Sequence, residues 1–396
     1  MNRGVAVTGM GIISAIGNNT EENYRSLLSK KSGISFPEIL NTTHKNIPVG
    51  EIKISNKSLA ESLELPKGHS FTRAALLGSI ALKEALEQSK IKIDTETGFI
   101  SGTSVGGIDE TENHFKEFTE GKTKNNRFIR SQHPGFTTGK IAGHFGITGF
   151  VSTISTACSS GANAIMMGAR MIKAGKLKRV IVGGTDCLTK FTLNGFNSLM
   201  ILSDQHCRSF DENRSGLNLG EGAAYLVLEA EEELKGKTVL GRIMGYGNAN
   251  DAFHQTASSE NGEGAFLAMQ EASKISKLSS EKIDYINAHG TATKNNDLSE
   301  SRAIQRLFGE NVPHFSSTKA FTGHSLAAAG ALEAVYSLIS LNKQQMFPNL
   351  NFSRAMSETG LEPVTELKEK KLNFILSNSF GFGGNCTSLI FAKDEA

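Results

Sequence analysis

A strand pattern passes directly into a helix pattern at Phe150-Val151-Ser152-Thr153-Ile154-Ser155-Thr156-Ala157-Cys158-Ser159-Ser160-Gly161. The first five residues have the β-branched and aromatic content of a strand. Beyond the glycine, apolar residues recur at helical spacing as far as Ile172, and Gly175 offers a stop. The apolar run 179–184 then indicates a parallel strand buried on both faces. This order predicts a strand–helix–strand unit, and therefore an α/β fold with a mainly parallel sheet.

Cys158 stands where the strand becomes the helix. The unpaired N–H groups and the dipole of a helix N-terminus favour a thiolate, so the position predicts a lowered pKa and a nucleophile. Its small neighbours leave room for a substrate to approach. A small buried apolar role is the common alternative for a free cysteine. Partner residues elsewhere in the chain must decide between the two.

The composition sets limits on what the protein does. A chain of 396 residues can bury a large core and can hold two domains or one duplicated domain. Its net charge of +2 gives no sign of binding to nucleic acid or membrane, and no apolar run is long enough to span a bilayer. The four cysteines lack zinc-site spacing and a disulfide framework, which favours a reducing compartment. Residues 1–3 lead directly into a strand pattern, so we expect no signal peptide and a cytoplasmic protein.

The same succession of elements is found on both sides of a charged stretch at 229–237. This stretch is expected to be a surface linker, and the repeated succession favours internal duplication. The opening segment, Val5-Ala6-Val7-Thr8-Gly9-Met10-Gly11, predicts a strand entering a glycine turn. It is a poor match to a dinucleotide site, because Ser14 replaces the third glycine and no acidic residue follows at the expected distance. Helices are predicted at 71–89, 162–172, 264–276, 298–307 and 325–341, and further strands at 98–100, 283–287, 374–376 and 388–391.

Three motifs in the second half supply partners for the cysteine. His289 follows the strand 283–287, and open α/β sheets bind ligands at strand ends. Lys319 follows another predicted strand, and His324 opens the next helix. A buried lysine is costly unless it is paired, and Glu333 on that helix is a candidate partner. The glycine turn at 381–384 offers backbone N–H groups that could hold an oxyanion.

These motifs together resemble one family. Thr-Ala-Cys-Ser-Ser-Gly at Cys158, His-Gly-Thr-Ala-Thr at His289, Lys-Ala-Phe-Thr-Gly-His from Lys319 to His324, and Gly-Phe-Gly-Gly at 381–384 resemble the β-ketoacyl-acyl-carrier-protein synthases of the elongating, two-histidine branch. The resemblance covers essentially the whole chain. It implies a thiolase-like, five-layer αβαβα fold made of two duplicated halves with mixed five-stranded sheets. Residues 1–234 would form the half with the cysteine, and residues 235–396 the half with both histidines.

The resemblance also implies a reaction, the decarboxylative Claisen condensation. Cys158 would carry an acyl chain as a thioester, and the carbanion left when malonyl-carrier protein loses carbon dioxide would attack it. The backbone N–H groups of Cys158 and Phe382 would form an oxyanion hole, while His289 and His324 would donate hydrogen bonds to the enolate through Nε2. Lys319 would support the site, by holding His324 and the local charge balance or by orienting a water.

Substrate-binding roles follow by the same likeness. Thr291 and Thr293 match residues that contact a phosphopantetheine arm. Phe382 matches a gate over the cysteine, with glycines such as Gly383 as its hinge, and Phe196 would pack against that gate. Val105 matches the end of the acyl pocket. No cofactor is expected, because the phosphopantetheine belongs to the partner acyl-carrier protein; the other expected partner is a second ketosynthase subunit, identical or of the chain-length-factor type.

Two features depart from the usual family pattern. Asn385 and Cys386 replace a threonine and an asparagine after the glycine turn, so the hydrogen bonds that steady this turn are in question. The loop between Leu199 and Arg208 is short and poor in arginine, although basic residues there often help to dock the acidic carrier protein. General fatty-acid synthesis and a specialised polyene or polyketide pathway both stay open. A thiolase, which would use Cys386 as a second catalytic cysteine, is the main rival and is disfavoured by His324.

Overall fold

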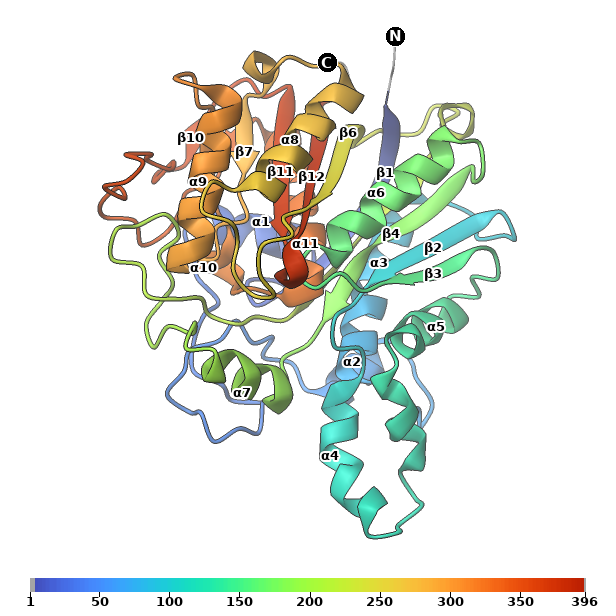
Figure 1. Ribbon diagram of the computed structural model, residues 1–396. Coiled ribbons are helices and arrows are strands. Elements are labelled where there is room, and N and C mark those ends of the chain that lie inside the picture. The colour runs from blue at the N-terminus through green and yellow to red at the C-terminus, as the bar shows by residue number, and fades with distance from the viewer. Residues whose placement is uncertain (1–3, 395–396) are drawn as a thin grey trace.

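The computed structural model describes residues 4–394 (Figure 1). The expectations about a leader at residues 1–3, and the outermost ends of the two predicted halves, lie outside this range. The first half of the chain carries five long strands and the helices between them. They are β1 (Val5–Ser14), α1 (Thr20–Leu28), α2 (Asn56–Ser62), α3 (Arg73–Ser89), β2 (Thr97–Gly102), α4 (Ile108–Thr119), η1 (Asn126–Gln132), α5 (Pro134–His144), β3 (Val151–Ile154), α6 (Ser160–Lys173), β4 (Arg179–Asp186), α7 (Lys190–Ser198), β5 (Gly222–Glu229) and η2 (Glu231–Glu233).

The second half repeats this plan and adds a small two-stranded sheet. Its elements are β6 (Gly241–Asn250), α8 (Glu263–Ser276), η3 (Ser280–Lys282), β7 (Tyr285–Asn287), α9 (Lys294–Phe308), β8 (His314–Ser316), α10 (Lys319–Thr322), η4 (Leu326–Ala328), α11 (Ala329–Lys343), β9 (Gln345–Met346), β10 (Lys368–Glu369), β11 (Phe374–Phe380), η5 (Phe382–Gly384) and β12 (Asn385–Ala392).

The strand order shows the duplication directly. The ten main strands run β3-β2-β4-β5-β1-β6-β12-β11-β7-β8, so each half has the same internal order read outward from β1 or β6. The parallel and antiparallel pairings also correspond strand by strand. β1 and β6 pair antiparallel from Val5 opposite Ile243 to Val7 opposite Gly241, which joins the two five-stranded sheets edge to edge. The predicted thiolase-like fold with two mixed five-stranded halves is confirmed.

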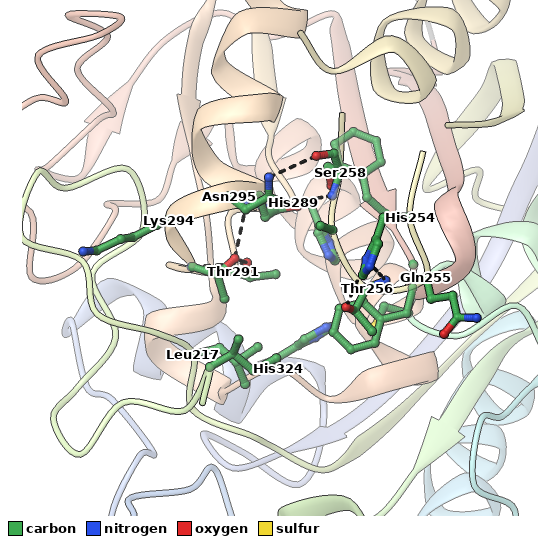
Figure 2. Close-up of a pocket in the computed structure, with 18 of the residues that line it drawn as sticks. Leu217, His254, Gln255, Thr256, Ser258, His289, Thr291, Lys294, Asn295 and His324 are labelled. Carbon is green, nitrogen blue, oxygen red and sulfur yellow. Dashed lines mark hydrogen bonds between the residues drawn. The ribbon is translucent and has the colours of Figure 1, made fainter. Parts of the chain in front are cut away.

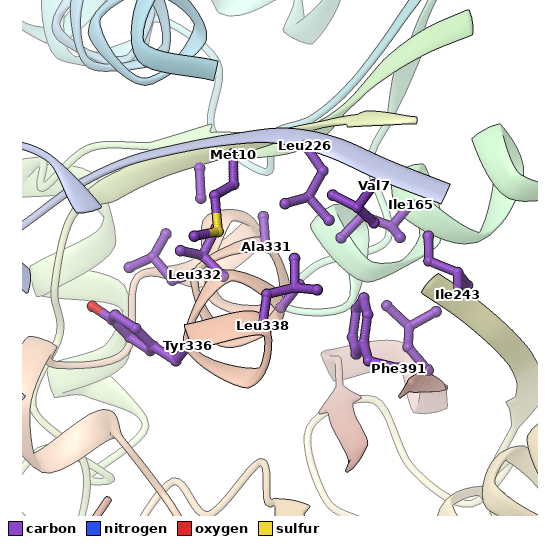
Figure 3. Packing of buried hydrophobic residues seen from close by; sticks show 14 of the residues in the cluster. Val7, Met10, Ile165, Leu226, Ile243, Ala331, Leu332, Tyr336, Leu338 and Phe391 are labelled. Carbon is purple, nitrogen blue, oxygen red and sulfur yellow. The ribbon is translucent and has the colours of Figure 1, made fainter. Parts of the chain in front are cut away.

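Helices form the remaining three layers. α3 packs on β1 and β5, and α8 packs on β6 and β12, on the outer faces of the two halves. α6 and α11 lie between the halves and contact strands of both. Side chains from both halves meet around α11, among them Val7, Ile165, Leu226, Ala331 and Phe391 (Figure 3). Burying this apolar surface from both halves makes them one core.

Glycines set how closely α6 and α11 approach. A Cβ atom on Gly161 of α6 would lie 2.8 Å from the Ala327 carbonyl oxygen. One on Gly330 of α11 would lie 2.9 Å from the Ala162 Cβ and 2.5 Å from the Ser379 Oγ. Real side chains do not tolerate such distances, so the crossing requires glycine at both positions. The helix that follows Cys158 and the helix that follows His324 therefore meet at the centre of the molecule.

Two local predictions are corrected, and β6 was not predicted. Gly9 and Gly11 do not form a turn but lie inside β1, where Cβ atoms would come within 2.4 Å of the α3 backbone. β6 escaped prediction because its glycines weaken the strand pattern, and Gly245 and Gly247 allow α8 the same close approach. The helix predicted at 325–341 begins as the 3₁₀ turn η4, and its α-helical part runs from Ala329 to Lys343.

Candidate active site

Cys158 lies in a tight turn between β3 and α6. Ala157 has a φ of +52°, which is unusual for a residue with a side chain, and Ser159 is the N-cap of α6. The Ser160 hydroxyl holds the turn, because it donates to the Ala157 carbonyl at 2.6 Å and accepts from the Thr156 N–H at 2.9 Å. The Cys158 side chain is 5% exposed and reaches a cavity of about 520 Å³.

The electrostatics at Cys158 differ from the sequence-based expectation. A helix N-terminus predicted a lowered pKa, but burial raises the pKa of the thiol to about 12. The charge of Lys319 and the backbone N–H of Phe382 act in the opposite direction and offset part of this effect. Burial therefore outweighs these effects and favours the protonated thiol.

His289 enters the same cavity from the loop after β7. Glu300 on α9 fixes this loop: its carboxylate accepts the N–H of His289 at 2.9 Å and the N–H of Gly290 at 2.8 Å. Burial, followed by the charges of Lys319 and His324, holds the pKa of His289 well below its usual value, so the ring is neutral. The His289 and His324 rings lie edge to face with centroids 5.3 Å apart (Figure 2).

Lys319 determines which nitrogen of His289 carries the proton. Its buried ammonium donates to the His289 carbonyl at 2.5 Å and to Nδ1 at 3.2 Å. Since an ammonium has no lone pair, Nδ1 must be the acceptor and the hydrogen of the neutral ring lies on Nε2. Lys319 also forms the predicted ion pair with Glu333. Burial raises the pKa of Glu333 to about 7, although the charge of Lys319 acts to lower it.

His324 is held by its backbone between α10 and η4. Its N–H donates to the Asn218 carbonyl at 2.7 Å, and its carbonyl accepts from Gly220 N–H at 2.9 Å. Burial and the charge of Lys319 lower its pKa well below the usual value. Nδ1 is buried and has no hydrogen-bond partner among the described residues. Lys319 makes its hydrogen bonds to His289 and Glu333 and not to His324, on which it acts through its charge; its role in orienting a water stays a prediction.

Phe382 lines the same cavity as Cys158. Its ring stacks on Phe196 of α7 with centroids 5.6 Å apart and an interplanar angle of 16°. Gly383 and Gly384 follow with φ of +83° and +82°, conformations that favour glycine. The Gly383 N–H donates to the Gln255 carbonyl at 2.7 Å, which ties the turn to the loop between β6 and α8.

Asn385 answers the question raised by the unusual end of the glycine turn. Its Oδ1 accepts hydrogen bonds from the Ser159 hydroxyl at 2.7 Å, from Asn163 Nδ2 at 2.8 Å and from Asn248 Nδ2 at 2.9 Å. The segment after the glycine turn is therefore bonded both to the first turn of α6 and to β6. An asparagine one position earlier than the usual one provides these bonds.

The remaining predicted residues fall in two groups. Thr291 and Thr293 line the cavity and hydrogen-bond to each other at 3.0 Å, and Gly383 also lines it. Val105 lies outside this lining, in an apolar cluster that includes Phe196. Cys386, which the rival interpretation used, is buried and lines the cavity as well.

Sequence reasoning missed two carboxylates that position the site. One is Glu300, described above; the other is Asp186 at the end of β4, which accepts the Thr103 hydroxyl at 2.6 Å and the Ala327 N–H at 2.9 Å. Glu300 had a signal, because it stands one helical turn after Asp297 on a helix that begins close behind the histidine motif. Asp186 had none, since its partners are distant in sequence.

The comparisons with known proteins agree with this geometry. Residues 2–234 match the model of the β-ketoacyl synthase N-terminal domain, and residues 240–353 match that of the C-terminal domain. The chain belongs to the β-ketoacyl synthase family. This synthase is 32% identical to 3-oxoacyl-[acyl-carrier-protein] synthase 2 of Staphylococcus aureus strain COL, over 100% of the chain and 99% of the relative. It is 36% identical to a putative mitochondrial 3-oxoacyl-[acyl-carrier-protein] synthase of Schizosaccharomyces pombe, over 98% and 99%.

Solved structures with the same architecture include ketosynthases, two of them named together with a chain length factor. The synthase superposes on the ishigamide ketosynthase/chain length factor with a TM-score of 0.93 and 26% identity, covering 99% of each chain. It matches a ketosynthase of Xenorhabdus doucetiae in complex with its chain length factor with a TM-score of 0.83 and 31% identity, covering 98% of each. A third match, with a TM-score of 0.88 and 25% identity over 99% of each chain, is a ketosynthase bound to its acyl-carrier protein.

Residues 4–394 contain no cluster of three or more His, Cys, Asp or Glu side chains arranged to hold a metal ion. Over the same residues, no helix combines the length and the apolar character needed to cross a membrane.

Proposed function

We propose that this synthase catalyses the decarboxylative condensation of a malonyl-carrier protein with an acyl chain held on Cys158. The observation that supports this proposal most is that Cys158, His289 and His324 line one cavity. In addition, Lys319 donates a hydrogen bond to Nδ1 of His289, so the hydrogen of this ring lies on Nε2. A cysteine nucleophile beside a fixed neutral hydrogen-bond donor suits a reaction that first makes a thioester and then an enolate.

The first half-reaction is a thioester exchange. The Cys158 sulfur attacks the carbonyl of the acyl-carrier thioester, and the pantetheine sulfur leaves with the proton that the cysteine gives up. Negative charge develops on the carbonyl oxygen during the attack. The N–H groups of Cys158 and Phe382 are suited to stabilise it, since both already favour negative charge at this place by lowering the pKa of the thiol.

The second half-reaction forms the carbon–carbon bond. Loss of carbon dioxide from the malonyl group leaves its bonding electrons as an enolate, and Nε2–H groups of His289 and His324 would donate to the enolate oxygen. The carbon end of the enolate then attacks the Cys158 thioester, and the cysteine sulfur leaves. Lys319 and Glu300 are positioning residues in this scheme, because they hold His289 through its ring and its backbone.

Substrate and partner assignments complete the proposal. Thr291, Thr293 and Gly383 line the path of the phosphopantetheine arm, Phe196 supports the Phe382 gate, and Val105 bounds the acyl pocket. The synthase needs no cofactor of its own, acts in the cytoplasm, and divides into halves at residues 234 and 235. It works as a dimer, either with itself or with a chain-length-factor-like subunit, and its product enters fatty-acid or specialised polyene or polyketide synthesis.

Mass spectrometry of the intact protein tests the central step. We expect incubation with a panel of acyl-carrier proteins to add one acyl group to the wild-type protein, and Cys158→Ala to remove this addition. Cys207→Ala is the matched control, because Cys207 is equally buried but does not line the cavity. Acylation of the Cys158→Ala protein would overturn the assignment, and the chain that loads best would identify the acyl substrate.

A further inference from the structure

The two histidines of the cavity are held in different ways. His289 is fixed both at its ring, by Lys319, and at its backbone. The ring of His324 lacks such support, because its Nδ1 is buried without a hydrogen-bond partner among the described residues. His324 is held through its backbone instead: its N–H donates to the Asn218 carbonyl and its carbonyl accepts from the Gly220 N–H. The position of this histidine therefore depends on the segment that carries these two residues.

Glu221 anchors this segment directly after Gly220. Its carboxylate is buried and accepts hydrogen bonds from three separate parts of the chain. Oε1 accepts the Ile52 N–H at 2.9 Å, and Oε2 accepts the Leu188 N–H at 3.1 Å. The Arg73 guanidinium makes the third contact, because Nη2 donates to Oε1 at 2.6 Å and Nε donates to Oε2 at 2.8 Å. The residue that follows Gly220 is thus fixed from three directions.

The ion pair of Arg73 and Glu221 lies inside the protein. The two side chains are 7% and 0% exposed. Arg73 Nη2 also donates to the Ile52 carbonyl at 2.7 Å. Its Nη1 donates to the Ile54 carbonyl at 3.0 Å and to Asn56 Oδ1 at 2.8 Å. All five N–H groups of the guanidinium are therefore used, and its rigid plane fixes Glu221 relative to the first turn of α3.

The backbone passes this constraint on to His324. The Gly50 carbonyl accepts the Glu221 N–H at 3.0 Å. A Cβ atom on Gly50 would lie 1.9 Å from the Thr322 carbonyl oxygen, and one on Gly220 would lie 2.3 Å from the same atom. The three backbone segments are therefore in direct contact with no side chain between them. Since close-packed interiors transmit strain, a shift of Glu221 must move His324 as well.

We propose that Arg73 and Glu221 are positioning residues for His324, acting through the backbone of residues 218–220. This inference rests on the proposed function, in which His324 donates a hydrogen bond to the enolate. Condensation uses this donor, whereas acylation of Cys158 does not. Loss of the ion pair therefore slows the second half-reaction selectively.

Single-turnover measurements of the two half-reactions test the proposal. Transfer of the acyl group from acyl-carrier protein to Cys158 is followed first, and the loaded protein is then mixed with malonyl-carrier protein. We expect Glu221→Gln to lower the condensation rate about tenfold or more and to change the acylation rate by less than about twofold, because small misplacements of a donor are costly. Arg73→Lys keeps the charge but loses the planar fork, and should lower the condensation rate by a smaller factor.

Glu229→Gln is the matched control. Glu229 ends β5, whereas Glu221 directly precedes this strand, and both carboxylates are buried and ion-paired. The partners of Glu229 are Lys237 and the Thr8 hydroxyl, which donates at 2.6 Å. We expect this variant to have a lower melting temperature but wild-type rates in both half-reactions.

NMR of the protein with isotope-labelled histidine adds a readout that does not depend on catalysis. The ring signals are assigned with His289→Ala and His324→Ala. We expect Glu221→Gln to move the signals of His324 and to leave those of His289 in place, since Lys319 holds the latter ring. If Glu221→Gln does not fold, Arg73→Lys supplies the same rates and spectra.

Three results would count against the positioning role. They are equal slowing of both half-reactions, wild-type condensation in the folded variants, and His324 signals that stay where they are in the wild-type protein. A wild-type protein that does not load Cys158, or that loads it and does not condense, would instead contradict the proposed function.

Discussion

At Cys158, burial and the helix terminus act on the thiol in opposite directions. The first turn of α6 favours the thiolate, whereas burial of the thiol raises its pKa to about 12. The net effect is a thiol whose pKa lies above its ordinary value. Lys319 stands close enough to lower the pKa of the thiol, yet its hydrogen bonds go to His289 and Glu333.

Alkylation kinetics test the state of the thiol. Because the reactive form is the thiolate, a pKa near 12 predicts that the rate of reaction with iodoacetamide rises about tenfold for each pH unit from 6 to 9, with no plateau. Intact mass spectrometry of the Cys158→Ala variant provides the background from other cysteines. A plateau near neutral pH would show that the helix terminus outweighs burial.

At the scale of elements, the closest contacts between helices and strands are made over glycines. Gly9 and Gly11 lie against α3, Gly245 and Gly247 lie against α8, and Gly330 lies where α11 crosses α6. Their equivalent placement in β1 and β6 is a structural record of the duplication. It also explains why the residue pattern did not predict β6. Gly245 and Gly247 weaken the strand pattern, yet the close packing of α8 requires them.

Stability measurements on two glycines test the helix crossing. Gly330→Ala places a Cβ 2.5 Å from the Ser379 Oγ and 2.9 Å from the Ala162 Cβ, so α6 and α11 must separate; we expect a loss of about 1–3 kcal/mol in the free energy of unfolding. Gly139→Ala on α5 is the control, because its Cβ would meet nothing within 4 Å. For Gly139→Ala we expect the free energy of unfolding, measured with urea, to rise by up to about 1 kcal/mol. Equal effects of the two changes would contradict the packing argument.

At the scale of the whole molecule, Asp186 links the two halves next to the active site. Its carboxylate accepts N–H groups from Ser104 at 3.0 Å and from Ala327 at 2.9 Å, one in each half of the chain. Ala327 follows His324 by three residues, and Ser104 precedes Val105. The Asp186 side chain thus connects the segment that carries His324 to the segment that carries Val105, which we propose bounds the acyl pocket.

The exchange Asp186→Asn tests this link. An amide cannot accept on both sides, so one buried N–H would face another donor, at a cost of about 1–3 kcal/mol in stability. We also expect slower condensation, with Cys158 acylation less affected, because the His324 segment shifts. Asp284→Asn is the control: Asp284 accepts two backbone N–H groups, of Asn373 and Phe374, within one half. If both variants lost only stability, Asp186 would have no positioning role.

The amino-acid sequence was enough to predict the chemical groups of the site and their order along the chain: a cysteine at a strand–helix turn, two histidines, a lysine with Glu333, and a glycine turn. These are local patterns, and short-range backbone preferences encode them. Four features could be seen only in the folded structure. Lys319 contacts His289, and Glu300 and Asp186 hold the site. Glycines lie inside β1 and β6, and burial raises the pKa of Cys158. Contacts between segments that are remote in sequence form only when the two halves pack together, and the same packing buries the Cys158 thiol.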